Sequence, residues 1–284
     1  MNYTIQLPAS QKPLSLADLL EKQWLVPRKV RHLLRMRKNC LVNGAVAEFH
    51  QIVQAGDTLT VILEETDYNY QPLQLGQAKN VKVLYEDSHL IVVDKPAGIK
   101  THPNEPGEKG TLMNDLAAYL ATSQSRPYVV HRLDQETSGT LLFAKNPLVL
   151  PLLSRLLEEK QIYRRYQALV KGEISRDLTI TKKIGRDRHD RRKRVIDPRG
   201  GQIAVTHVEV FSHTPKESRI FCILETGRTH QIRVHLAALG HPIIGDPLYS
   251  KQTAPRLMLH AYQMSLKHPF TEETIEITAN PGLW

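Results

Sequence analysis

The chain has 284 residues, of which 41% are hydrophobic, and a formal net charge of +9. This length is enough for one large or two smaller domains with a substantial core, and no stretch approaches the roughly 18 apolar residues of a membrane span. The N-terminus lacks a charged start and an apolar signal core, and the two cysteines, Cys40 and Cys222, show no Cys-x-x-Cys spacing. We therefore expect a cytoplasmic protein with reduced, structural cysteines and no membrane association.

Most of the positive charge lies in two segments. Residues 28–38 carry six basic residues and no acidic one, and residues 183–199 carry eight basic residues against three acidic ones. The rest of the chain is slightly acidic. Such concentration favours a polyanionic partner, although a solvated surface would show the same charge.

Residues 15–36 predict two short helices. Ser15 can cap a helix from Leu16 to about Gln23, and Pro27 can open a second helix that runs to Met36. Three arginines of the second helix are spaced by three and four residues and therefore share one face: Arg28, Arg31 and Arg35.

Residues 40–63 predict short strands. Cys40-Leu41-Val42 and Ala45-Val46 flank an Asn-Gly turn, and residues 58–63 form a further strand. Together, about residues 14–63 resemble the small RNA-binding module of one small-subunit ribosomal protein and of bacterial tyrosyl-tRNA synthetases. The resemblance implies that Arg28, Arg31 and Arg35 bind RNA phosphates, which adds affinity and orientation but reads no sequence.

The next segment is interpreted as a linker followed by the start of a second domain. Residues 64–80 are polar and show no hydrophobic periodicity. Strands are then expected at residues 81–85 and 90–94, and amphipathic helices at about residues 111–122 and 147–160.

Residues 128–144 predict a strand, an exposed turn and a second strand. The turn contains His131-Arg132-Leu133-Asp134-Gln135-Glu136-Thr137-Ser138-Gly139 and therefore brings an imidazole, a guanidinium and a carboxylate within four residues. A turn carboxylate beside a cation is ionised at neutral pH and can act as a nucleophile or a base. Asp134 could also simply bond its own backbone, as most turn aspartates do.

The C-terminal half predicts further strands at residues 162–170, 204–210 and 219–224. The first contains Tyr166, for which a place in the core is the common fate of a strand aromatic. Residues 226–235 form a glycine turn that leads into a helix, which Gly240 ends. His230 and His235 lie about 140° apart on such a helix, unlike the histidines of zinc helices, so we expect no metal.

Several of these motifs resemble those of the RluA-type family of RNA pseudouridine synthases. The matches are Tyr-Glu-Asp-x-x-Leu-Ile-Val-Val-x-Lys-Pro-Ala-Gly at 85–98, His-Arg-Leu-Asp-x-x-Thr-Ser-Gly at 131–139, and Thr-Gly-Arg-x-His-Gln-Ile-Arg-x-His at 226–235. Residues 164–172 match Lys-x-Tyr-x-Ala-x-Val-x-Gly with Arg164 in place of the lysine. The basic segment after Lys183 is similar to a loop between catalytic strands, with Arg188 where a proline is expected. The resemblance covers most of residues 81–284.

This resemblance implies a reaction and a role for several residues. It implies isomerisation of uridine to pseudouridine within RNA, without a cofactor, with Asp134 as the catalytic carboxylate and Arg228 as its ion-pair partner. Tyr166 would pack on the target base, and Arg132 would fill the space that the flipped base vacates. The N-terminal module favours large-subunit ribosomal RNA as substrate, with transfer RNA as the alternative.

Two other functions are compatible with parts of the sequence. One is an RNA-binding or ribosome-assembly factor with a vestigial site, against which the joint presence of Asp134, Tyr166 and Arg228 speaks. The other is a nucleoside or glycoside hydrolase, which usually needs two carboxylates, and only Glu136 is close to Asp134.

The predicted fold class is α+β. We expect a small α+β RNA-binding module at residues 1–63, a linker at 64–80, and at 81–284 a catalytic domain with a mixed, mainly antiparallel sheet. No strand–helix–strand repetition indicates a doubly wound sheet. We also expect a monomer.

Overall fold

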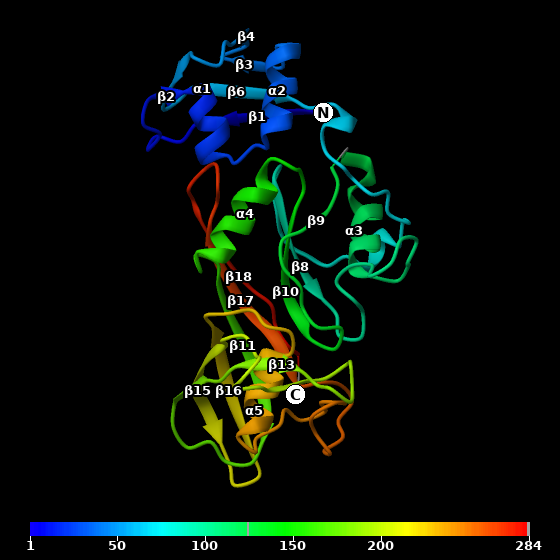
Figure 1. Ribbon diagram of the computed structural model, residues 1–284. Helices are drawn as coiled ribbons and strands as arrows, with labels where there is room; N and C mark the ends of the chain where they lie inside the picture. The colour runs from blue at the N-terminus through cyan, green and yellow to red at the C-terminus, as the bar shows by residue number, and fades with distance from the viewer. Residues whose placement is uncertain (124, 283–284) are drawn as a thin grey trace.

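The computed structural model describes residues 1–123 and 125–282. It shows an α+β protein in which a small N-terminal module lies at one end of a larger, sheet-based body (Figure 1). This agrees with the predicted fold class. Every helix in the described part of the chain is too short or too polar to cross a bilayer.

The N-terminal module combines a four-stranded antiparallel sheet with two helical segments. Ser15 Oγ accepts a hydrogen bond from the Asp18 amide at 3.1 Å, which confirms the predicted helix cap. The Asn-Gly turn is also confirmed, because Asn43 and Gly44 have φ values of 52° and 82°. The elements are β1 (Asn2–Gln6), β2 (Leu14–Ser15), α1 (Leu16–Asp18), the π-helix η1 (Leu19–Gln23), α2 (Arg28–Arg37), β3 (Cys40–Val42), β4 (Ala45–Val46), β5 (Ile52–Val53) and β6 (Thr58–Ile62).

The body is built on a ten-stranded sheet. Its main path has the order β12-β15-β16-β11-β17-β10-β8-β7, with β18 paired to β17 and β9 to β10. Its named strand pairs in the described residues are antiparallel except β10 with β17. The strands are β7 (Val83–Glu86), β8 (Leu90–Lys95), β9 (Tyr128–Val129), β10 (Ser138–Ala144), β11 (Tyr163–Lys171), β12 (Leu178–Thr181), β15 (Val205–His213), β16 (Glu217–Leu224), β17 (Leu259–Lys267) and β18 (Thr274–Thr278).

Helices and one hairpin surround this sheet. The second basic segment, predicted as a loop, folds into a two-stranded hairpin of β13 and β14. The remaining elements are β13 (Ile184–Arg186), β14 (Arg194–Ile196), α3 (Leu112–Leu120), α4 (Val149–Glu158), α5 (Gln231–Ala238), and the 3-10 turns η2 (Glu65–Asp67), η3 (Ala78–Asn80) and η4 (Ala121–Ser123).

The module and the body share one hydrophobic core. Buried residues of the module pack in the same cluster as residues of α4, β10 and β17. At the junction the Trp24 and Phe270 rings meet edge to face at 5.1 Å, and the Arg155 guanidinium donates to the carbonyls of Lys22 and Gln23 at 3.2 and 2.9 Å. The module is therefore docked by apolar burial and by hydrogen bonds.

Residues 64–80 are also held in place. Arg37 donates to the buried Asp67 carboxylate at 2.7 Å, and the Gln77 amide donates to Asp115 on α3 at 2.7 Å. The segment thus contacts both the module and the body along its length.

Candidate active site

The turn that carries Asp134 joins β9 to β10 and is fixed by a buried ammonium group. Lys95 is fully buried, and its Nζ donates to the carbonyls of Pro96, Gln135 and Thr137 at 2.8–2.9 Å. All three ammonium hydrogens are thereby used. Burial lowers the pKa of Lys95 to about 8, although the nearby carboxylates of Glu136 and Asp134 favour its charged form. The amide of Thr137 also donates to the Asp134 carbonyl at 3.1 Å, so the backbone around Asp134 is held from several sides.

Gly139 lets this turn approach β17 closely. Its φ is +111°, and a Cβ at this position would lie 2.3 Å from the Ala261 carbonyl oxygen. Any other residue would clash with backbone and adopt a strained conformation. The glycine therefore permits the parallel pairing of β10 with β17 next to Asp134.

Arg233 is the ion-pair partner of Asp134. Its Nη1 lies 3.2 Å from Asp134 Oδ2, and its Nε and Nη2 each donate to the Asp246 carboxylate at 2.8 Å. Burial opposes charge on Arg233, which is 3% exposed, but Asp246 and Asp134 outweigh it and raise the pKa of the guanidinium. Because Asp246 holds the guanidinium in two places, Arg233 is a fixed cation that orients Asp134.

His230 also lies near the Asp134 carboxylate. Its Nε2 is 3.8 Å from Asp134 Oδ2, and its Nδ1 is 2.9 Å from the Tyr249 hydroxyl. That hydroxyl also accepts a hydrogen bond from the Arg194 amide at 2.7 Å. Burial lowers the pKa of His230, although the Asp134 charge opposes this.

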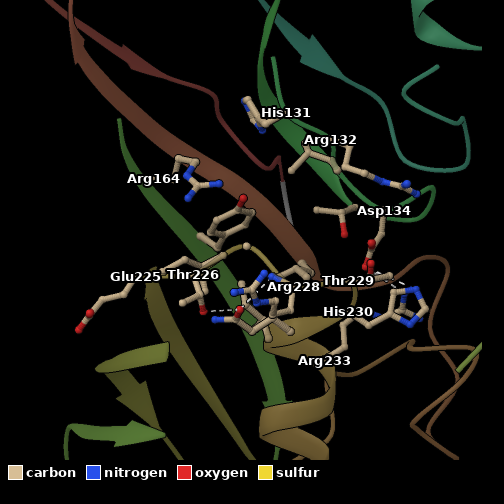
Figure 2. A pocket seen from close by; sticks show the side chains of 18 of the residues that line it. His131, Arg132, Asp134, Arg164, Glu225, Thr226, Arg228, Thr229, His230 and Arg233 are labelled. Carbon is tan, nitrogen blue, oxygen red and sulfur yellow. Dashed lines mark hydrogen bonds and ion pairs between the residues drawn. The ribbon is translucent and has the colours of Figure 1, made fainter. Parts of the chain in front are cut away.

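Asp134 opens onto a hollow of about 560 Å3, here called the Asp134 hollow. Its walls come from the Asp134 turn, β11 and residues 224–233. Tyr166 lines it, and burial raises the pKa of this phenol, while Arg164 lowers it in part. Figure 2 shows Arg164 and Asp134 on opposite sides of the view, and both line the hollow.

The predicted pairing of Arg228 with Asp134 is wrong. Arg228 lines the same hollow, but its Nε donates to the Ile203 carbonyl at 3.2 Å. It precedes α5 in an irregular turn, whereas Arg233 lies in the first turn of α5 and extends to Asp134. The motif contains both arginines, and the start of the helix decides which of them reaches the carboxylate.

The other predicted residues lie in different places. Arg132 lines the Asp134 hollow beside Asp134 and is exposed; in Figure 2 it extends away from Arg164. Arg28 and Arg35 are exposed on α2 in the distant module, and Arg31 forms an ion pair with Glu21. His131 is buried beneath the turn, where its Nε2 accepts from the Leu142 amide at 3.3 Å, and burial lowers its pKa to about 3.

Two family models match separate parts of this chain. A family model described as RNA pseudouridylate synthase matches residues 89–238, which include the Asp134 turn, Tyr166 and Arg233. The chain belongs to the RNA pseudouridine synthase family. A second model, described as the RluD ribosomal pseudouridine synthase N-terminal domain, matches residues 3–59.

Curated relatives of this pseudouridine synthase cover most of its length. An uncharacterised RNA pseudouridine synthase of Bacillus subtilis, YhcT, is 43% identical over 80% of the chain and 76% of the relative. Proteins named ribosomal large subunit pseudouridine synthase D are 37% identical in Nitrosomonas europaea and 41% identical in Neisseria meningitidis serogroup B. The aligned regions cover 88% and 84% of this chain and 77% and 68% of those relatives.

Solved structures support the pseudouridine synthase fold. Human RNA pseudouridylate synthase domain containing 1 superposes with a TM-score of 0.61 at 29% identity, over 74% of this chain and 88% of its own. The domain containing 4 protein superposes with a TM-score of 0.60 at 24% identity, over 72% and 90%. The protein is thus an isomerase that acts on RNA, and the predicted family and enzyme class are confirmed.

Two important residues of this synthase, Arg233 and Lys95, received no role from the sequence. Arg233 stands between Ile232 and Val234, which are buried, and a buried arginine needs an acidic partner. Asp246, in the Gly-Asp pair thirteen residues later, was the available signal. Nothing in the sequence around Lys95 indicates that its ammonium caps three carbonyls of a distant turn.

Proposed function

We propose that this pseudouridine synthase modifies uridine in large-subunit ribosomal RNA, with Asp134 as its catalytic carboxylate. The observation that carries the proposal is that Arg233 orients the Asp134 carboxylate at the edge of a hollow lined by Tyr166. The choice of RNA rests on the relatives named ribosomal large subunit pseudouridine synthase D and on the match of residues 3–59. Transfer RNA is the alternative substrate.

The reaction is an isomerisation and needs no added reagent. The N1–C1′ bond breaks, the base turns, and C5 bonds to C1′, while C5 loses a proton and N1 gains one. Asp134 acts at the sugar, either as a nucleophile at C1′ or as a base, and both roles use the same carboxylate. Arg233 lies within hydrogen-bond distance of Asp134 and holds it in one orientation.

The remaining wall residues bind the substrate. The target nucleotide leaves its stack at a cost of a few kcal/mol, and Arg132 takes the vacated position. Tyr166 supports the flipped base from the floor of β11. Arg228, which is not paired with Asp134, binds the substrate within the hollow instead.

Each of three segments of the chain has a separate role in this proposal. Residues 1–63 bind RNA phosphates through the basic face of α2, residues 64–80 connect the module to the body, and residues 81–284 carry the chemistry. Arg28 and Arg35 supply the accessible charge, since Arg31 already pairs with Glu21. The enzyme works as a monomer in the cytoplasm.

Pseudouridine mapping tests the whole proposal. Carbodiimide-based mapping of total RNA from cells without the gene should lose a signal in large-subunit ribosomal RNA, and the wild-type gene should restore it. Asp134→Asn should not restore it, although the purified variant should still bind RNA. Glu276→Gln, an equivalent change on the exposed face of β18, is the control and should restore the signal.

Each outcome is distinct. Loss of a signal in transfer RNA alone would replace the proposed substrate. Restoration by Asp134→Asn would remove Asp134 from the chemistry. No loss at any position, with normal RNA binding, would favour a binding or assembly factor.

A further inference from the structure

A second hollow meets the first at Asp134. It has a volume of about 550 Å3 and lies between loop residues 100–104 and hairpin residues Arg192 and Lys193. It is here called the hairpin hollow. The two hollows share Arg132, Asp134 and Arg233, so a chain that leaves the Asp134 hollow can continue directly into the hairpin hollow.

The hairpin hollow is rich in positive charge. Five cations line it against two acids, Asp134 and Glu136. Three of the cations already have carboxylate partners, because Lys100 pairs with Glu108, Arg192 with Asp190, and Arg233 with Asp246. Arg132 and Lys193 have no ion pair within the described residues and can bind an anion without breaking one.

The hairpin that supplies Lys193 is tied to the catalytic carboxylate. Next to Lys193, the Arg194 amide donates to the Tyr249 hydroxyl at 2.7 Å, and this hydroxyl bonds His230, whose Nε2 faces Asp134. These hydrogen bonds hold the first residue of β14 at a fixed place relative to Asp134. The backbone that carries Lys193 is therefore held near the site rather than at the tip of a free loop.

His102 supplies an imidazole ring to the wall of this hollow. Its side chain lines the hairpin hollow, and its Nδ1 is buried without a hydrogen-bond partner in the described part of the chain. Burial and the Arg132 charge lower the pKa of this imidazole, so it is neutral. A neutral imidazole can donate to or accept from the edge of a nucleobase.

We propose that the hairpin hollow binds the nucleotide next to the target uridine, with its phosphate on Lys193 and its base beside His102. This inference rests on the proposed function, because it requires a target uridine in the Asp134 hollow. It assigns Lys193 to the placement of the adjacent phosphate and His102 to contact with the adjacent base, in contrast to the face of α2, which would bind phosphates alone. A free nucleotide would not suffice, since the two hollows have to be filled by one continuous strand.

The test uses a short synthetic RNA that spans the mapped uridine. Each phosphate near that uridine is replaced, one at a time, by a neutral methylphosphonate, and kcat/KM is measured by tritium release from 5-tritiated uridine. For wild type, we expect one linkage adjacent to the target to lower kcat/KM about tenfold. Lys193→Met should lose about the same factor on unmodified RNA and lose nothing more at that linkage.

Two variants make the result specific. Lys193→Arg keeps the charge and should retain wild-type sensitivity to the linkage. Arg188→Met removes one positive charge from the same hairpin at an exposed position outside both hollows, and it should behave as wild type. Replacement of the adjacent base by an abasic site should likewise lower kcat/KM for wild type but not lower it further for His102→Ala.

The inference and the proposed function fail differently. A wild-type enzyme that converts no uridine in any RNA would overturn both. An active wild type with additive losses for Lys193→Met and every methylphosphonate would overturn the inference alone. Equal effects of Lys193→Met and Arg188→Met would also overturn it.

Discussion

The protein carries basic residues of two kinds, in the active site and on the N-terminal module. Arg233 is 3% exposed, and its guanidinium donates twice to Asp246 and once to Asp134. These hydrogen bonds hold the guanidinium in a single position. Arg28 and Arg35 on α2 are exposed and have no ion pair in the described residues. In the proposed function the first kind of cation orients the reacting carboxylate, and the second attracts RNA without reading its sequence.

Arg31 and Lys95 show that the sequence position of a basic residue does not decide which of these two kinds it belongs to. Arg31 shares a helix face with Arg28 and Arg35, yet it is bound to Glu21 across the module. Lys95 is as buried as Arg233, but carbonyl oxygens rather than carboxylates surround it. The difference between the two regions therefore lies in the partners of each cation, which substitution can change.

Loss of the Asp246 carboxylate, which fixes Arg233, should have the largest effect on the reaction rate. Asp246→Asn removes the carboxylate that fixes the guanidinium, so we expect the single-turnover rate to fall about a hundredfold with little change in RNA affinity. Because the pair is buried, the free energy of unfolding should fall by about 3 kcal/mol. Asp190→Asn breaks the exposed pair with Arg192 and is the matched control, expected to change stability little. An unchanged rate for Asp246→Asn would show that Arg233 needs no fixing.

Tyr166 comes next, because in the proposed function it supports the base rather than the carboxylate. Tyr166→Leu should lose about 1–3 kcal/mol of stacking, which corresponds to a loss of five- to 150-fold in rate. Tyr166→Phe keeps the ring, and we expect it to fail only at the late removal of the proton from C5. Single-turnover tritium release distinguishes the two steps. A Phe variant as fast as wild type would leave Tyr166 as a stacking surface alone.

The α2 face should show a smaller effect, seen mainly in salt dependence. Arg28 and Arg35 together replaced by alanine should lower the slope of log K against log salt by roughly one to two, with turnover at saturating RNA retained. Arg31→Ala should change the slope less, because that arginine is already paired with Glu21. Equal changes for Arg31 and for Arg28 would show that RNA displaces Glu21. An unchanged slope for the double variant would make α2 a solvated face.

Lys95 should produce an effect of another kind, a dependence of stability on pH. Its pKa is about 8 in the folded protein, against an ordinary 10.5, so the unfolded chain binds more protons between these values. The folded state therefore gains stability as the pH rises from about 8 to 10.5, by at most about 1.4 kcal/mol per pH unit. Urea unfolding should show this rise for wild type and not for Lys95→Met, while Lys251→Met should resemble wild type. A constant difference between wild type and Lys95→Met would contradict the lowered pKa.

Local rules in the sequence predicted most of the elements and the centre of the site. The Ser15 cap, the Asn43-Gly44 turn and the strand–turn–strand around Asp134 follow from neighbours in the chain, and the structure contains all three. Asp134 and Tyr166 meet at one hollow, as the motifs indicated. Their roles in the chemistry await the experiments above.

Features that depend on distant contacts were not predictable in this way. The choice between Arg228 and Arg233 depends on where α5 begins and on Asp246, thirteen residues beyond Arg233. The basic segment forms a hairpin in which β13 pairs with β14. Its position depends on the distant Tyr249, whose hydroxyl accepts a hydrogen bond from Arg194, the first residue of β14. The polar composition of residues 64–80 likewise gave no indication that Arg37 and Asp115 would hold them.

The N-terminal module is docked on the body through Trp24, Phe270 and Arg155, and this docking fixes its distance from the active site. With a shared core, the separation between α2 and Asp134 is set by packed side chains and does not vary with a free tether. If α2 and Asp134 act as proposed, an RNA satisfies both sites only when its uridine lies at the matching distance from the backbone bound by α2. Under that proposal the enzyme would select its target by distance from α2 as well as by local sequence, and a change at Trp24 would alter which uridine is modified.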